Sequence, residues 1–286
     1  MQKIRLVTVT GSRTNTLRHM LNHYNDLIDE IYVVVYEWDG FSTYDIVYEI
    51  VKEFPKAKIV RREIKEKFNW EYVTQLYNET KLLHPNDWWV VSDDDEFHIY
   101  PKPIRELISD CEENNWEFVT GGFIDRIGEN GEFPQINEHT NIWTQFPLAG
   151  FFRYPMSGAC PNKVCIMKGS VNVTSGQHYV EFGNNKTSWG TSHPNRYPIG
   201  RGDGLIQVHH FKWDSTCMDR IKDVANIKKQ YAFSTEYEKM YNAIEWNDFK
   251  IDINNEEFFI EKMNPQISDF SDYSKWNRLA KKITKI

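Results

Sequence analysis

Short apolar segments alternate with segments of helical periodicity in the first part of this 286-residue chain, and this alternation constrains the fold more than any other feature. Strand patterns lie at 3–10, 31–36, 57–61 and 88–91, with helical patterns between them at 17–28, 44–54 and 70–83. Strands that alternate with helices form βαβ units, in which the strands pair in parallel. The sequence therefore predicts an α/β fold with a mostly parallel central sheet flanked by helices.

The later part of the chain is less regular. Residues 118–124 and 163–167 show strand patterns, and residues 181–204 are rich in Gly, Asn, Pro and Ser without periodicity. A loop of that length is typical of a lid or a binding loop. Because no repeat or linker divides the chain, we predict one domain over 1–235 and a C-terminal helical extension over 236–286 that packs on it or trails it.

Composition argues against several classes of protein. The net charge of −7 disfavours a nucleic-acid partner, because binding phosphates needs a surplus of Lys and Arg. No stretch approaches the ~18 apolar residues of a membrane span, and the first residues lack a signal-peptide pattern, so a cytoplasmic location is expected. Aromatic residues make up 15% of the chain, which indicates that some rings line a ligand surface.

The four cysteines are predicted to be reduced thiols, because no Cys-x-x-Cys pair occurs among Cys111, Cys160, Cys165 and Cys217.

Polar clusters follow three of the predicted strands at the points where the strands end. They lie at 10–13, 37–40 and 93–96. Open parallel sheets bind their ligands beyond the carboxyl ends of the strands. The three clusters are therefore expected to converge on one rim of the sheet.

The cluster at 93–96 (DDDE) directly follows the apolar segment WWVV. Carboxylates this close together raise one another's pKa, so holding them in one place is costly. A divalent cation would remove that cost, and hard oxygen ligands suit Mg²⁺ or Mn²⁺. The alternative is a solvated acidic turn that starts a helix, where acidic side chains interact favourably with the helix dipole.

A second cluster, at 208–213 (VHHFKW), places two histidines in an apolar setting. In an extended segment the rings of His209 and His210 point to opposite faces, so at most one of them is expected to bind the same ion. Lys212 offers a positive charge for a diphosphate. The alternatives are a hydrogen-bonded core histidine and a surface lysine.

The segment WVVSDDDEF and the downstream HFKW resemble the Asp-x-Asp glycosyltransferases of the GT-A fold, especially the family 2-like and family 92-like groups with the pattern Asp-x-Asp-Glu-Phe. The similarity spans residues 3–235 and includes matching segments at 69–70, 121–126, 131, 145–147 and 176–178. It implies a GT-A type nucleotide-diphospho-sugar transferase fold and a metal-dependent glycosyltransferase of the hexosyltransferase type. It further implies a nucleotide-diphosphate sugar as donor, a glycan or lipid-linked acceptor, and Mn²⁺ or Mg²⁺ as cofactor.

The resemblance also implies roles for single residues. Asp93 would face the ribose and the metal, Asp95 would coordinate the metal directly, and His210 would close the metal site. Glu37 and Asp39 are approximate counterparts of the turn that holds the base in family 2. The residues expected to bind the nucleotide sugar are Thr10, Arg13, Glu37, Asp39, Asp93, Asp94, His178 and Lys212.

The chemistry of transfer adds two requirements. Lys212 or Arg13 would stabilise the charge that develops on the leaving diphosphate. An inverting enzyme also needs a carboxylate that accepts the proton of the acceptor hydroxyl, and Asp125 and Glu181 are the candidates. The alternatives are a salt bridge or loop cap for Asp125 and plain surface charge for Glu181. Three tryptophans would either stack on a sugar or belong to the core, namely Trp70, Trp143 and Trp189.

Three other functions stay open at this point. A metal-dependent nucleotidyltransferase or phosphohydrolase would act on the same kind of nucleotide, although the loop at 10–15 has a single glycine where nucleotidyltransferases carry several. A non-catalytic carbohydrate-binding protein would use the aromatic rings for glycans. A degenerate transferase would keep the fold as a scaffold.

The C-terminal residues 275–286 combine five basic residues with an apolar stripe of helical spacing and contain no acidic residue. Such a helix can lie on an anionic membrane, which would suit a lipid-linked acceptor. In the alternative, the stripe packs on the domain and the lysines are solvated. The sequence thus leaves two predictions for this segment: a peripheral membrane contact or packing on the domain.

Overall fold

The computed structural model describes residues 2–38, 40–182, 185–187, 194–198, 205–226, 233–263, 273–284 and 286. The chain divides into two compact units, and each is described by itself. Unit 1 is Met1–Gly122 with Asn162–Ile206, and unit 2 is Phe123–Pro161 with Gln207–Ile286. The predicted boundary at 235/236 lies inside α8 (Ser234–Trp246), and the predicted division into 1–235 and 236–286 stays a prediction. The chain passes from one unit to the other inside two strands, at Gly122/Phe123 and Ile206/Gln207, and directly before a third strand, at Pro161/Asn162.

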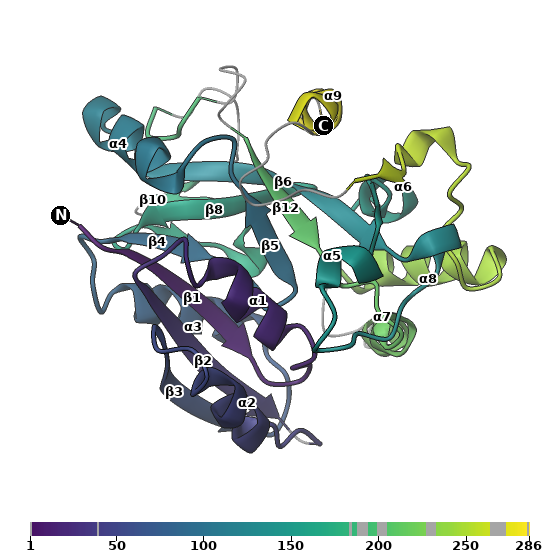
Figure 1. Cartoon of the computed structure of the whole chain (residues 1–286), viewed down its shortest axis with the longest axis horizontal. Helices are drawn as coiled ribbons and strands as arrows, with labels where there is room; N and C mark the ends of the chain where they lie inside the picture. The colour runs from purple at the N-terminus through teal and green to yellow at the C-terminus, as the bar shows by residue number, and fades with distance from the viewer. Residues whose placement is uncertain are drawn as a thin grey trace. The chain divides into compact units, whose positions relative to one another are not determined.

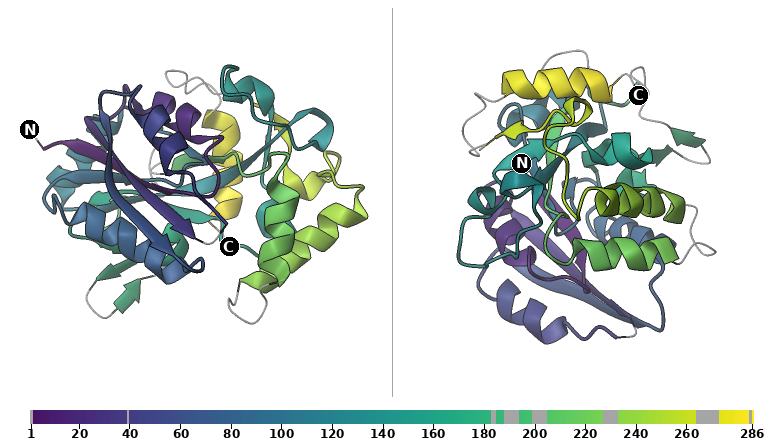
Figure 2. Two further views of the ribbon diagram at one scale, coloured as in Figure 1. Left: turned by 90° about the horizontal axis from the view of Figure 1, so that it is seen from below. Right: turned by 90° about the vertical axis from the view of Figure 1, so that its right-hand side faces the viewer.

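Unit 1 is built on four parallel strands in the order β4-β1-β2-β3. Their bounds are β1 (Ile4–Thr10), β2 (Glu30–Trp38), β3 (Ala57–Lys65) and β4 (Trp88–Val91), and they are joined by α1 (Leu17–Tyr24), α2 (Tyr44–Val51) and α3 (Trp70–Lys81). Helices α1 and α2 cover one face of the sheet and α3 covers the other (Figures 1 and 2). With both faces covered, β4 is buried along its whole length, which explains its continuous apolar sequence.

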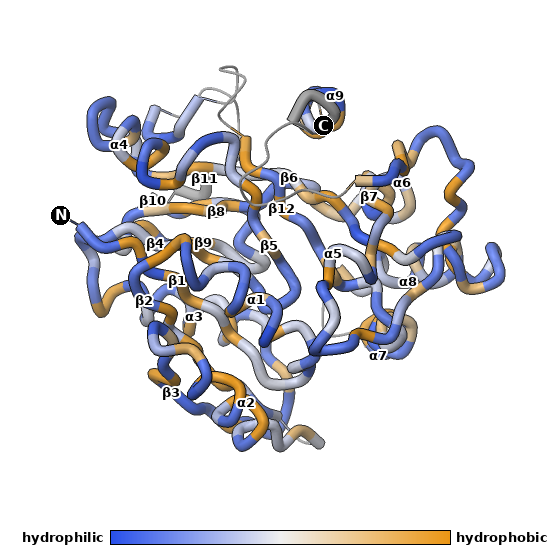
Figure 3. The backbone as a smooth tube through the Cα atoms, viewed as in Figure 1, coloured by the Kyte–Doolittle hydropathy of each residue, from blue (hydrophilic) through white to orange (hydrophobic). Residues whose placement is uncertain are grey.

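Two antiparallel strands extend this sheet beyond β4. Strand β8 (Asn162–Lys168) pairs with β4, and the first half of β6 (Phe118–Ile127) pairs with β8. Apolar residues concentrate in β1, β4 and β8 (Figure 3). The predicted α/β class, with a mostly parallel central sheet flanked by helices, is confirmed. The antiparallel addition was not predicted, because strand direction depends on partners distant in sequence.

The rest of unit 1 consists of short elements. They are β5 (Glu96–Ile99), α4 (Ile104–Asn114), the 3₁₀ turn η2 (Ser175–Gln177) and a small antiparallel sheet of β9 (Asn172–Val173), β10 (Val180–Phe182) and β11 (Asn185–Thr187). The predicted lid or binding loop at 181–204 lies largely outside the described residues.

Unit 2 combines the second half of β6 with two short antiparallel strands and a layer of helices. Strand β6 pairs with β7 (Leu148–Gly150), which pairs with β13 (Glu261–Lys262), and β12 (Ile206–His210) also pairs with β6. The helices are α5 (Ile142–Gln145), α6 (Arg153–Ser157), α7 (Cys217–Asn226), α8 and α9 (Tyr273–Ile283), with 3₁₀ turns η1 (Glu129–Gly131) and η3 (Glu256–Phe258). The core holds Ile127, Phe152, Trp213, Cys217, Ile221, Met240, Ile244, Ile251 and Phe258.

The C-terminal helix α9 buries its apolar stripe. Trp276, Leu279 and Ile283 are each at most 1% exposed. The Lys282 ammonium lies 4.5 Å from the ring centroid of Phe259. The structure thus agrees with the alternative in which the stripe packs on the protein, and a stripe buried in this way cannot insert into a membrane. Lys285, one of the five basic residues of this segment, lies outside the described residues. None of the helices in the described ranges is long and apolar enough to cross a bilayer.

Replacing Trp276 by Ala should lower the free energy of unfolding by about 3–5 kcal/mol, because it leaves a large cavity under α9. Trp246→Ala is the matched control, since Trp246 is 93% exposed and its loss should change stability by less than about 0.5 kcal/mol. Urea unfolding monitored by circular dichroism measures both. Equal stability of the two variants would show that α9 does not pack as described.

Candidate functional site

The acidic cluster forms a tight turn at the carboxyl end of β4. The backbone N–H of Glu96 donates to the carbonyl of Asp93 at 3.1 Å, and the Ser92 hydroxyl donates to the carbonyl of Glu96 at 2.6 Å. The buried strand β4 therefore delivers Asp93, Asp94 and Asp95 together at one edge of the sheet.

A buried lysine, Lys163, holds this turn. Its ammonium donates to Glu96 at 2.7 Å, to Asp93 at 3.2 Å and to the side-chain carbonyl of Gln177 at 2.5 Å. The antiparallel register of β8 beside β4, with Ile166 opposite Val90, carries Lys163 to the end where the turn begins. Burial by itself lowers the pKa of Lys163, but Asp93 and Glu96 together raise it above its usual value.

Lys163 was not among the site residues predicted from the sequence. The available signal is a lysine near the start of an otherwise apolar strand, NKVCIMK. Lys163 supplies part of the charge neutralisation that we expected from a divalent cation, because its ammonium group offsets one of the four carboxylate charges. The segment at 176–178 was singled out for its resemblance, and the structure links it to the acidic turn through Gln177.

Side chains from neighbouring strands and helices complete the turn. The Tyr77 hydroxyl of α3 donates to Asp93 at 2.6 Å, and the Thr10 hydroxyl at the end of β1 donates to Asp94 at 2.5 Å. A longer contact of 3.5 Å joins Thr10 to the backbone carbonyl of Arg13. The polar clusters after β1 and β4 thus meet on one rim, as expected for adjacent parallel strands.

The third polar cluster has a structural use. Glu37 is buried and accepts the backbone N–H groups of Thr43 at 2.6 Å and Tyr44 at 2.9 Å, which caps α2, and it also pairs with Arg62. Position 11 must be glycine, because the Cβ of any other residue there would lie 1.7 Å from the carbonyl oxygen of Tyr36. Nucleotide binding by Glu37 stays a prediction that competes with this capping role. Asp39 lies outside the described residues.

The remaining predicted residues of unit 1 lie in its peripheral elements. His178 Nδ1 is 2.7 Å from the carbonyl of Asn162, and Glu181 lies in the middle of β10. Trp70 begins α3 with its ring 5.0 Å from that of Phe68. Trp189 lies outside the described residues. The roles proposed for His178 and Glu181 stay predictions.

In unit 2, Asp125 is a buried carboxylate with both oxygens engaged. It accepts from Trp213 Nε1 at 2.9 Å and from the backbone N–H of Arg153 at 3.0 Å, and His210 Nδ1 lies 3.7 Å away. Burial raises the pKa of Asp125, but His210, the Arg153 charge and Trp213 lower it below its usual value. Asp125 is therefore an enclosed carboxylate that holds the Trp213 indole and the Arg153 backbone, and its role as catalytic base stays a prediction.

The two histidines of β12 have different surroundings, as predicted from strand alternation. His209 accepts from Arg126 Nε at 2.9 Å through Nδ1, so it carries its proton on Nε2, which lies 2.9 Å from the side-chain oxygen of Gln207. His209 is thus a hydrogen-bonded core residue. His210 lies beside Asp125 and the ring of Phe123.

Lys212 is also buried, which excludes the surface-lysine alternative. Its ammonium donates to the Tyr237 hydroxyl at 3.2 Å. Burial lowers the pKa of Lys212.

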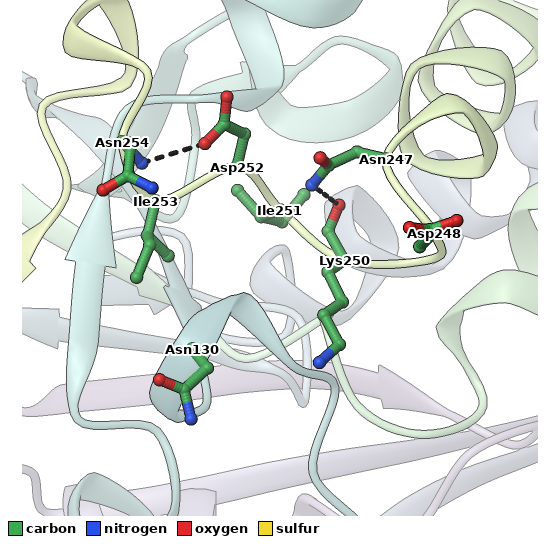
Figure 4. A pocket seen from close by; sticks show the side chains of 8 residues that line it. All are labelled: Asn130, Asn247, Asp248, Lys250, Ile251, Asp252, Ile253 and Asn254. Atoms are coloured by element: carbon green, nitrogen blue, oxygen red, sulfur yellow. Dashed lines mark hydrogen bonds between the residues drawn. The ribbon is translucent and has the colours of Figure 1, made fainter.

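A shallow hollow of about 390 Å³ lies elsewhere in unit 2 (Figure 4). Its polar groups bond to one another, as in the contact of the Asn247 side chain with the carbonyl of Lys250 at 3.0 Å. It contains none of the predicted site residues, since it is lined by Asn130, Asn247, Asp248, Lys250, Ile251, Asp252, Ile253 and Asn254.

No protein-family model and no curated protein sequence matches this chain. Solved structures similar to it include S. aureus TarS in complex with UDP-GlcNAc, with 12% identity, a TM-score of 0.35, and 83% of this chain and 69% of that chain covered. Another is 4-diphosphocytidyl-2C-methyl-D-erythritol synthase, with 15% identity, a TM-score of 0.30, and coverage of 59% and 77%. A third is mannose-6-phosphate isomerase from Helicobacter pylori, with 12% identity, a TM-score of 0.34, and coverage of 59% and 71%. Similarities this weak carry no argument about the reaction.

Replacing Lys163 by Met should lower the free energy of unfolding at pH 7 by about 3–5 kcal/mol, because the buried Glu96 loses the ammonium group that neutralises its charge. The deficit should shrink as the pH falls towards 5, since a buried carboxylate without a cation has a raised pKa and takes up a proton. Urea unfolding of both proteins across this pH range measures it. Lys168→Met, which removes a partly exposed pair with Glu112, should show neither effect.

Proposed function

We propose that this protein is a metal-dependent glycosyltransferase of the GT-A type. It moves a sugar from a nucleotide-diphosphate donor to a hydroxyl group of a glycan or a lipid-linked acceptor. The observation that carries the proposal is the acidic turn at the carboxyl end of β4, held by Lys163 and joined to Thr10 of β1. An edge formed by adjacent parallel strands is where open α/β sheets bind nucleotides.

The side chains of the turn suit Mn²⁺ or Mg²⁺. Four carboxylates against one lysine leave an excess of negative charge, and all of the donors are hard oxygens. By the resemblance of this segment to the Asp-x-Asp transferases, Asp95 would make the direct metal contact and Asp93 would face the ribose and the metal. When bound, the ion would stabilise negative charge on the diphosphate leaving group.

His210 is the proposed nitrogen ligand, on the basis of its place in the segment HFKW. Metal-binding histidines usually have a carboxylate near the other ring nitrogen, which fixes the ring. Asp125 lies 3.7 Å from His210 Nδ1 and can serve in this way, leaving Nε2 to the metal. We therefore propose Asp125 as a positioning residue rather than as the catalytic base.

The other roles follow from charge. Lys212 would hold the diphosphate, with Arg13 as a second cation. Glu181 remains the candidate for the base that accepts the proton of the acceptor hydroxyl. The buried stripe of α9 supplies no support for membrane contact, so an acceptor that is lipid-linked would have to be recognised by other residues.

The proposal is tested by incubating the protein with Mn²⁺ and a panel of nucleotide-diphosphate sugars and measuring the nucleotide released. Asp95→Asn should reduce this release to less than about a tenth, because a neutral amide is a weaker ligand than a carboxylate. Asp26→Asn, at an exposed position in unit 1, should leave the rate unchanged. Pyrophosphate production from a nucleoside triphosphate and a sugar phosphate, with no release from the panel, would instead indicate a nucleotidyltransferase.

His210→Ala should weaken Mn²⁺ binding about tenfold or more in a calorimetric titration, since a ligand is lost. His209→Ala should retain the Mn²⁺ affinity but lower the melting temperature, because Arg126 and Gln207 lose a buried partner. If His209→Ala is the variant that loses Mn²⁺ binding, the assignment of His210 is wrong.

A further inference from the structure

A tryptophan at the end of α8 is almost fully exposed. Trp246 is 93% exposed, and two further large apolar side chains follow it closely, since Phe249 is 49% and Ile253 is 36% exposed. A packed aromatic side chain buries about 150–250 Å², so a ring that stays in water forgoes a large hydrophobic gain. Exposed apolar groups that gather in one segment are typical of an interaction site.

The shallow hollow of Figure 4, which we call the polar hollow, begins at the residue that follows Trp246. Its volume of about 390 Å³ falls within the range of small-ligand sites, about 300–1,000 Å³. Asn130 of η1 forms one part of its lining, and the segment 247–254 forms the rest. The exposed ring and the polar hollow are thus neighbours along the chain within unit 2.

The backbone fixes the lining of the polar hollow. The backbone N–H of Ile251 donates to the carbonyl of Gly131 at 2.9 Å, and the Ile251 side chain belongs to the core of unit 2. Three lining or neighbouring residues have left-handed backbone conformations, with φ of 58° at Asn130, 51° at Asp248 and 58° at Phe249. Residues other than glycine held in this conformation cluster at ligand sites. A ligand would therefore find a preformed site and would not have to order a loop.

The polar side chains of the hollow keep hydrogen-bonding capacity for a ligand. Among the residues that the structure describes, the side chains of Asn130, Asp248 and Asn254 form no hydrogen bond or ion pair with one another or with other residues. Asp252 accepts a single hydrogen bond, from the backbone N–H of Asn254 at 3.0 Å. The amides can donate and accept, and the carboxylates can accept.

The charge of the lining narrows the class of ligand. Asp248 and Asp252 face one lysine, Lys250, whose ammonium already lies 3.1 Å from Glu132. The lining therefore disfavours a phosphate or another anion. An uncharged molecule with many hydroxyl groups matches it, because each hydroxyl can donate to a carboxylate and accept from an amide. A sugar also has an apolar C–H face that can cover an exposed indole ring.

We propose that the polar hollow and the Trp246 ring form a binding site for the sugar units of a glycan chain. Asn130, Asp248 and Asn254 would form hydrogen bonds with sugar hydroxyl groups, and Trp246 would pack against the C–H face of a sugar ring. This binding requires neither a metal nor a nucleotide. The inference therefore does not rest on the proposed function.

The test is a screen of the full-length protein on an array of neutral oligosaccharides of glucose, mannose, galactose and N-acetylglucosamine, in the presence of EDTA. Calorimetric titration with an oligosaccharide that binds then gives the dissociation constant. Trp246→Ala should raise it about tenfold or more, because the apolar contact is lost. Asn254→Ala should raise it about fivefold, as expected for one hydrogen bond. Melting curves establish that both variants are folded.

Two matched controls make the test specific. Tyr48→Ala removes an exposed aromatic ring from α2, and Asn172→Ala removes an exposed asparagine from β9, both in unit 1. Both should bind the oligosaccharide as the unchanged protein does. Absence of binding across the array, or binding that neither Trp246→Ala nor Asn254→Ala weakens, would overturn the inference. Titration with Ca²⁺ without EDTA covers the remaining alternative, since Ca²⁺ binding that is lost in Asp248→Asn, without any sugar binding, would indicate a cation site instead.

The same proteins separate this inference from the proposed function. Sugar binding that depends on Trp246, without release of nucleotide from any nucleotide sugar, would support the glycan site and refute the transferase. Nucleotide release by a protein that binds no oligosaccharide of the array would support the transferase and refute the glycan site.

Discussion

The ion cluster of Lys163, Asp93 and Glu96 is the interaction on which the candidate site depends. Four consecutive carboxylates repel one another, and Glu96 is buried where water cannot screen it. Lys163 makes the turn possible by placing one ammonium against two of the carboxylates and against Gln177. Because Lys163 comes from β8, the geometry of the turn depends on the antiparallel extension of the sheet as well as on β4.

The two units carry complementary chemistry. Unit 1 presents oxygen ligands in negative excess at the ends of β1 and β4, while unit 2 holds the buried Lys212 and the pair of Asp125 and His210. A nucleotide-diphosphate sugar requires both kinds of group, since a metal site and cations must together stabilise its leaving group. The residues of each unit can be tested without those of the other.

Much of unit 1 was predictable from the sequence. Strand and helix periodicity is a local property, and parallel βαβ units bring the carboxyl ends of their strands to one rim, so the convergence of the polar clusters was predictable. The pairing of β1 with β4, which brings Thr10 to Asp94, came from the structure. The alternation of side chains along a strand likewise separated His209 from His210 before their partners were known. The division into units was not predictable, because the chain changes unit inside β6 and β12 rather than in a linker.

The sequence by itself determined the α/β class, the order of the first strands and helices, and the position of the acidic turn, because these depend on the spacing of residues close together in the chain. Only the tertiary structure decided which charges are compensated and which apolar stripes are buried. The structure gives Lys163 its acidic partners, shows that Glu37 caps α2, and buries the apolar stripe of α9. The partners that define these residues come from segments remote in sequence or from packing, and the energy of a charge or an apolar group depends on those partners.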